Sequence, residues 1–231
     1  MNLVKRDCPV KIELKPCGSY YLNVKLEIRG DQHSFLPSGA MSFFFSEFMG
    51  AVYALYHEDV DCHHPPYAQN PSKRAKHTLP KDDPSLHDDE IRIESDVVWD
   101  EEGIIDTISF CRVFSRNPSF TEGENTDPVS VTVTYKYHPV RSGQYTYSVD
   151  GRDLCYAIGK AATAALKEYG FYGYQYATGC GVVESDLIDM NQLIFFKAYA
   201  LNAMEARTLK KHEQVYSSSF QKELELILFD M

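Results

Sequence analysis

The sequence of 231 residues has no long apolar run. No window approaches the roughly 20 apolar residues that a membrane-spanning helix needs. The first ten residues, MNLVKRDCPV, carry the positive charge of the first region of a signal peptide, but no apolar segment follows them. We therefore expect a cytoplasmic protein that begins at Met1 and has no membrane partner.

The sequence also lacks the cysteine spacing that is typical of disulfide-bonded domains. The six cysteines include no C-x-x-C pair and show no repeated spacing. A chain of this length with 44% apolar residues can bury a substantial core without disulfides. We expect reduced thiols, with Cys111 and Cys155 as small core residues because they lie inside apolar periodic segments.

The sequence has no motif that names a reaction. Gly179 and Gly181 lack the preceding strand and the third glycine of a phosphate-binding loop. Cys180 lies between them in a turn-like context, but nothing in the sequence places a histidine beside it, so the glycines are explained more simply by a turn. We expect no catalytic residue and no cofactor.

What the sequence does contain is a concentrated negative charge. The formal net charge is −10, and residues 82–106 hold 11 acids and a single base, Arg92, whereas the rest of the chain has 22 acids and 22 bases. Because phosphate contacts are made mostly by lysine and arginine, a protein with this charge is a poor nucleic-acid binder. A basic protein is the expected partner.

Hydrophobic periodicity predicts the fold class. Alternation predicts strands over residues 11–14, 20–29, 91–99, 104–114, 129–138 and 144–149, and the run VSVTVTYKY beginning at Val129 has the clearest period of two. Three- and four-residue spacing predicts helices over residues 38–57, 153–169, 185–211 and from 218 onward. We expect one α+β domain over residues 1–231, with an antiparallel sheet of about six strands and helices packed on one face in two layers.

The helix ends carry their own signals. Gly170 is the expected terminator of the helix over residues 153–169. Lys210, Lys211 and His212 suit the negative end of the next helix, and Ser218 with Gln221 forms a capping box for the last. The aromatic stretch 169–176, which includes Gly170, is expected to be the core face of a strand.

Residues 58–90 contain five prolines and few apolar side chains, which predicts a long irregular loop. Five of the eight histidines fall between His57 and His87, and Cys62, His63, His64 and His77 are candidate zinc ligands. Their spacing fits no zinc finger, and Asp61 stands where a metalloprotease helix would have its second histidine. A solvated polar loop explains the cluster more simply, as it does the short basic patch at residues 72–77.

Several segments together resemble bacterial immunity proteins of polymorphic toxin systems such as contact-dependent growth inhibition. They are the N-terminal hairpin, the segment FLPSGAMSFFFSEFMGAVYAL at residues 35–55, the acidic strands around Trp99–Gly103, and the helix that ends at Lys167–Gly170. The resemblance covers the layout of residues 10–175 and carries over no functional residue. It implies a non-enzymatic cytosolic protein that binds and neutralises a cognate toxin, and inhibitors of basic nucleases in such families are often acidic.

From charge and resemblance together, we expect this chain to bind a basic toxin domain through its acidic stretch. The expected contacts are Asp88, Asp89, Glu90, Glu94, Asp96, Trp99, Asp100, Glu101, Glu102 and Asp106, with Trp99 as a possible anchor. The acids from Glu94 to Asp106 lie on a predicted hairpin and are held in place, whereas those from Asp82 to Glu90 belong to the loop. Two alternatives stay open: a metal-binding enzyme or regulator built on the 57–87 loop, and a structural or oligomerising protein that uses the 169–176 stretch.

Overall fold

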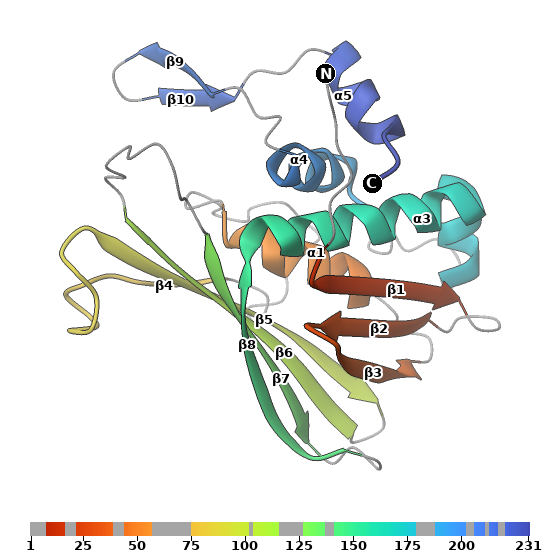
Figure 1. Ribbon diagram of the computed structural model, residues 1–231, viewed down its shortest axis with the longest axis horizontal. Coiled ribbons are helices and arrows are strands. Elements are labelled where there is room, and N and C mark those ends of the chain that lie inside the picture. The colour runs from red at the N-terminus through yellow and green to blue at the C-terminus, as the bar shows by residue number, and fades with distance from the viewer. Residues whose placement is uncertain are drawn as a thin grey trace.

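Two antiparallel β-sheets, a short ribbon and four helices form the described part of the chain in the computed structural model (Figure 1). The α+β class expected from the sequence is confirmed. The strands divide into groups of three, five and two, where the sequence predicted a single sheet of about six. The structure describes residues 8–16, 22–38, 44–56, 75–101, 104–115, 127–136, 141–178, 188–201, 206–210, 213–216 and 220–231.

The smaller main sheet has the order β1–β2–β3, with bounds Val10–Pro16, Leu22–Ile28 and Asp31–Ser38. β1 and β2 pair as the predicted hairpin. β3 was not predicted, because the Leu36–Pro37 pair indicated a break. Proline is tolerated near the end of an edge strand, and the turn at Arg29 and Gly30, both with positive φ, returns the chain directly along β2.

The larger sheet has the order β4–β5–β6–β7–β8, with bounds Lys76–Thr78, Glu90–Glu101, Ile104–Ser115, Pro128–Lys136 and Gly143–Asp150. All neighbouring strands are antiparallel. β5 to β8 confirm four of the predicted strands. β4 is a three-residue strand inside the stretch that the prolines marked as irregular.

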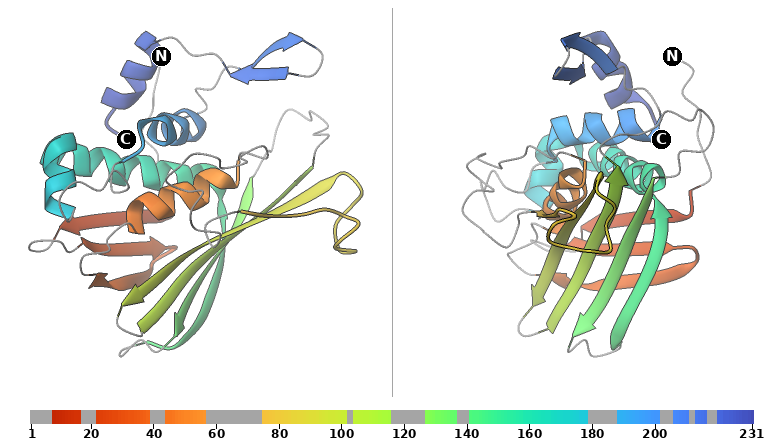
Figure 2. Two further views of the ribbon diagram at one scale, coloured as in Figure 1. Left: turned by 180° about the vertical axis from the view of Figure 1, so that it is seen from behind. Right: turned by 90° about the vertical axis from the view of Figure 1, so that its left-hand side faces the viewer.

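Helices α1 (Phe44–Ala54) and α3 (Gly151–Thr178) pack against these sheets (Figures 1 and 2). The three- and four-residue spacing of Phe45, Phe48, Met49 and Val52 places these side chains on one stripe, and all four are buried. The stripe faces β5, where the Ser95 hydroxyl donates to a backbone carbonyl of α1 at 2.8 Å. α3 lies along β1 and contacts the next helix, α4.

Gly170 interrupts α3 with a backbone that is not helical (φ 66°, ψ 172°). The first helical run therefore stops at the glycine that the sequence marked as its terminator. A second helical run continues to Thr178, so the expectation of a strand over residues 169–176 was wrong. The side chains of the aromatic residues there lie outside the described ones, and an oligomer contact through them stays a prediction.

The C-terminal elements differ most from expectation. α4 spans Met190–Ala200 and is capped by Asp189, whose carboxylate accepts from two backbone amides. The predicted helix was longer, to residue 211, but Ala206–Lys210 is strand β9, paired with β10 (Glu213–Tyr216). α5 spans Phe220–Leu228; Lys211, His212 and Ser218 lie outside the described residues. No described helix has the length and apolar character needed to cross a membrane.

Lys197 of α4 anchors the C-terminal helix. Its side chain is completely buried, and its Nζ donates to the backbone carbonyls of Leu226, Ile227 and Phe229 at 2.9, 2.9 and 2.8 Å. Those carbonyls end α5, where a cation also complements the helix dipole. Burial lowers the pKa of Lys197 to about 8, so the ammonium is the main form at neutral pH.

Replacing Lys197 with methionine tests this anchor. Lys197→Met keeps most of the buried chain length but removes three hydrogen bonds, and we expect the free energy of unfolding to fall by about 2 kcal/mol. Urea unfolding followed by circular dichroism measures the change. The exposed Lys160 of α3 provides the control, and a Lys160→Met loss as large as that of Lys197→Met would contradict the anchor.

Candidate protein-binding face

The five-stranded sheet has one covered face and one uncovered face. Along β7, Val129, Val131, Val133 and Tyr135 are buried, and the residues between them are half-buried or exposed. The buried side chains point toward the helices and the three-stranded sheet. We call this side of the five-stranded sheet the inner face. We call the other side of the sheet the outer face, and none of the helices that the structure describes lies across it (Figure 2, right).

The strand register gathers small hydroxyl side chains at the centre of the outer face. β6, β7 and β8 align with Ser109 opposite Thr132 and Thr132 opposite Thr146, and the last two hydroxyl oxygens lie 3.1 Å apart. The neighbouring row on one side contains Thr107 and Thr134, and the row on the other side contains Ser130 and Ser148. Because these side chains are short, this part of the face is a level polar surface on which another protein can lie closely.

Acidic side chains border this surface along β5. Glu94 and Asp96 are two residues apart, so they lie on the same side of the strand. Glu94 lies 3.7 Å from Lys76 of β4, but both side chains are well exposed, at 43% and 74%, so this ion pair neutralises little. Asp96 is exposed beside it, followed by the 46% exposed Val98. Partial desolvation raises the pKa of Asp96.

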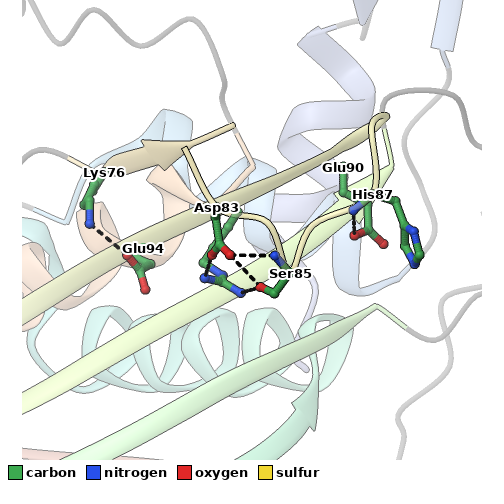
Figure 3. A network of polar contacts seen from close by, with 7 residues as sticks. Lys76, Asp83, Ser85, His87, Glu90 and Glu94 are labelled. Atoms are coloured by element: carbon green, nitrogen blue, oxygen red, sulfur yellow. Dashed lines mark hydrogen bonds and ion pairs between the residues drawn. The ribbon is translucent and has the colours of Figure 1, made fainter. Parts of the chain in front are cut away.

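The segment between β4 and β5 also contains acids, and several of them bind neighbouring residues (Figure 3). Asp83 accepts hydrogen bonds from the amide and hydroxyl of Ser85 at 2.9 and 2.7 Å and pairs with Arg92. These hydrogen bonds, with Arg92, lower the pKa of Asp83. Glu90 accepts from the amide of His87 at 2.9 Å. Residues 79–90 are therefore a set of hydrogen-bonded turns, more ordered than the predicted loop.

The other residues predicted to contact a partner lie in different surroundings. Asp88 is exposed within the turns, whereas Asp89 accepts a hydrogen bond from Ser115. Asp106 is fully buried on the inner face, on the same side of β6 as Ile108 and Phe110. It is therefore not part of the binding face. The backbones of Trp99, Asp100 and Glu101 lie in β5, but their side chains, and all of Glu102, lie outside the described residues.

The predicted metal ligands lie mostly beyond what the structure describes. Cys62, His63 and His64 are among the residues left out, and so is Cys180. His77 is exposed on β4, opposite Ile93. Within the described part of the chain, no three histidine, cysteine or acidic side chains are grouped to hold a metal ion. Metal binding by the 57–87 loop stays a prediction.

The cysteines that the structure describes, Cys8, Cys111 and Cys155, form no disulfide bond. Cys155 is completely buried in the core, as expected from its apolar segment. Cys111 is half-buried on the outer face, between Glu94 and Ser130 in the register, and not in the core. Burial raises the pKa of both thiols, which disfavours the reactive thiolate.

A largely buried ionic cluster that the sequence did not predict joins five elements. Arg112 of β6 donates to Asp127 through Nε at 2.7 Å and to the carbonyl of Leu55 through Nη1 at 3.1 Å. The other carboxylate oxygen of Asp127 accepts from the hydroxyls of Tyr56 and Tyr199 at 3.0 and 2.6 Å. Its backbone carbonyl accepts from the amide of Gly151, the first residue of α3, at 2.7 Å.

The contacts of this cluster indicate a role in stabilising the fold and not in catalysis. Burial above all, with the nearby Asp127 carboxylate, raises the pKa of Tyr56 and Tyr199, so both stay protonated donors. The Arg112 guanidinium is also stacked over the Tyr56 ring at 4.4 Å. A Cβ at Gly151 would overlap the Tyr56 hydroxyl and the Asp127 carboxylate, which leaves glycine as the residue that fits.

A second polar cluster joins the two main sheets. His33 of β3 is 1% exposed, and its Nδ1 and Nε2 lie 2.8 and 2.7 Å from the hydroxyls of Tyr135 and Tyr147. Desolvation lowers the pKa of His33, and the positive charge of Arg141 lowers it further, while Asp31 opposes them. Neutral histidine can accept at one ring nitrogen and donate at the other, so the ring bridges the sheets without a buried charge.

A cavity of about 420 Å³ lies between α3 and the first two strands. Its exposed charges are largely paired, with Lys11 bonded to Glu27 at 2.6 Å and Lys25 lying 3.5 Å from Glu13. Val10, Leu26 and Tyr156 contribute to an apolar lining. The cavity thus offers little that would select a charged ligand.

We expect Asp127→Asn to destabilise the fold strongly. The asparagine keeps the size of the side chain but removes the charge that balances the mostly buried Arg112 guanidinium, at a cost of about 3 kcal/mol. Chemical unfolding of the variant measures this loss. The exposed pair of Lys11 and Glu27 is the control: Glu27→Gln should cost far less, and equal losses would remove the special role of the cluster.

His33 should make the fold sensitive to acid. Its pKa in the folded state is lowered, so below about pH 6.5 the unfolded chain binds more protons than the folded one. The free energy of unfolding then falls as the pH drops from about 6.5 through the folded-state pKa. We expect His33→Gln to show a shallower fall between about pH 7 and pH 5. Parallel profiles for the two proteins in urea unfolding would contradict this assignment.

Comparisons of the chain with protein-family models, with curated proteins and with solved structures found no match.

Proposed function

We propose that this chain is a non-enzymatic binding protein whose outer sheet face docks on a basic protein, and that the partner is a toxin domain that the chain neutralises. The docking area is the hydroxyl-rich centre of the face and the acidic border formed by Glu94 and Asp96 on β5. This combines the expected acidic contact surface with the uncovered face of the sheet.

The observation that carries the proposal is the place of the charge in the fold. Residues 75–101, which form β4, the turns and β5, contain nine acids and three bases, and the chain outside residues 82–106 is balanced. The acids of β5 lie on a paired strand in the interior of the sheet order, so their positions are fixed before binding. Fixed side chains lose less conformational entropy on binding than side chains of a loop.

The surroundings of these acids also suit a protein partner. Next to Asp96, the exposed Val98 provides an apolar contact, and the hydroxyl rows of β6 and β7 provide small polar ones. A nuclease toxin keeps a cationic cleft for nucleic acid, and an acidic sheet face is complementary to such a surface. Complementary charge accelerates association by roughly 10- to 1000-fold and makes it sensitive to salt.

The internal pairing of the other charges favours binding over catalysis. Arg112 and Asp127 bind each other, and they also form hydrogen bonds with a backbone carbonyl and with tyrosine hydroxyls. His33 is engaged by two tyrosine hydroxyls at the junction of the sheets. Arg112, Asp127 and His33 are therefore engaged inside the fold, whereas Glu94 and Asp96 of the acidic border face outward.

Removing the border charges tests the proposal. The double variant Glu94→Gln, Asp96→Asn should slow association with a co-purifying basic partner by about three- to tenfold at low salt, and by much less at high salt. Surface plasmon resonance at two salt concentrations measures both rates. The matched control is Glu13→Gln, Glu27→Gln, which removes the same charge from the smaller sheet; equal slowing by both double variants would refute docking on β5.

The toxin-neutralising function has a separate test. The gene that neighbours this one is expressed in a bacterial host with and without the present chain, and we expect growth arrest only in its absence. Size-exclusion chromatography of the two purified proteins should show a complex that dissociates at high salt. Growth that is the same in both strains, with no complex in chromatography, would overturn the toxin assignment.

A further inference from the structure

The two edges of the five-stranded sheet are protected very differently. β4 forms one edge and is only three residues long, with a lysine side chain that is 74% exposed. A short edge strand and a charged side chain are both devices that prevent another strand from pairing there. In the smaller sheet, α3 lies along the edge strand β1. β8, the other edge of the larger sheet, has neither kind of protection.

The sequence of β8 leaves its edge open to pairing. The strand spans Gly143–Asp150, and its register with β7 runs without a bulge from one end to the other. It contains no proline and no charged residue between Gly143 and Val149. Unpaired N–H and C=O groups of such an uncharged edge strand without a bulge form a template for a further strand.

The exposure of β8 agrees with an open edge. Every residue from Arg141 to Thr146 is exposed, and so is Ser148. Tyr145 is 39% exposed although its neighbour in the register, Val133 of β7, is 0% exposed and both lie on the inner face. Monomeric proteins seldom leave a long uncharged edge with an aromatic side chain beside it in water.

We propose that β8 pairs antiparallel with β8 of a second copy of this chain, which joins the two larger sheets into one sheet of ten strands. A two-fold axis at Thr146 would place each Thr146 opposite its own copy. Tyr145 would then lie opposite Tyr147, and Gln144 opposite Ser148. All these pairs join residues of the same face, and they create aromatic and hydroxyl contacts with no pair of like charges.

The chemistry of β8 favours a second copy over another protein's strand. A foreign strand is normally selected by charges or by pockets for its side chains. The part of β8 from Gln144 to Ser148 is uncharged and complementary to itself about its centre. The pairing is independent of the proposed function, because it uses the edge of the sheet and leaves both outer faces on the same side of the dimer.

A charge at the centre of β8 tests the dimer. In Thr146→Lys, two lysines would lie directly opposite each other, and we expect the dissociation constant to rise at least about tenfold, as measured by sedimentation velocity over a range of concentrations. The matched control is Thr132→Lys, which places the same charge one strand inward on the same face and should leave the dimer unchanged. A wild-type chain that remains monomeric at the highest concentration, or a dimer equally stable in Thr146→Lys, would overturn the proposal.

A cysteine at the two-fold axis provides a second measurement that does not depend on weakening the dimer. Opposite Cβ atoms of an antiparallel pair lie about 5 Å apart, within the reach of a disulfide. Mild oxidation should therefore link Thr146→Cys chains into a covalent dimer on a non-reducing gel, and should not link Thr132→Cys chains beyond the wild-type level. Equal linking of the two variants, or no linking of Thr146→Cys, would refute the proposed register.

Discussion

The ion pair between Arg112 and Asp127 is the contact on which the arrangement of this fold most depends. It connects β6 to the residue before β7, and hydrogen bonds extend it to the end of α1, to α4 and to the first residue of α3. A buried charge that loses its partner is costly, so these elements must stay together for Arg112 to remain satisfied. The requirement for glycine at position 151 follows from the same crowding. The cluster thus holds the helices on one side of the five-stranded sheet.

Holding the helices on the inner face leaves the outer face and the β8 edge for other molecules. The apolar side chains of the strands point from the inner face into the core. Because residues alternate along β7, its hydroxyl side chains lie on the outer face. Neither the acidic border nor the open edge is needed to complete the core. Docking of a basic partner and pairing of two copies can therefore occur together, with one acidic border toward each end of a ten-stranded sheet.

The sequence predicted the features that depend on local pattern. Alternation located β5 to β8 within a few residues, and the spacing of Phe45, Phe48 and Val52 located α1. Features that depend on contacts between distant residues were missed. Tyr56 and Tyr199 lie 71 and 72 residues from Asp127, and no local signal links them. β9 was missed because apolar spacing extended a helix beyond its true end, and β3 because a proline near a strand end was read as a break.

The acidic stretch shows most clearly what register adds to composition. The sequence divided its eleven acids only into a loop group and a hairpin group, but the fold gives individual acids different roles. Asp83 secures a turn through Arg92 and Ser85, and the pairing of β6 with β5 carries Asp106 to the buried inner face. Glu94 and Asp96 are left on a paired strand, facing outward beside small hydroxyl side chains. Charge available for binding therefore depends on hydrogen bonds and register, which engage Asp83 and bury Asp106, and a count of acids alone would overestimate it.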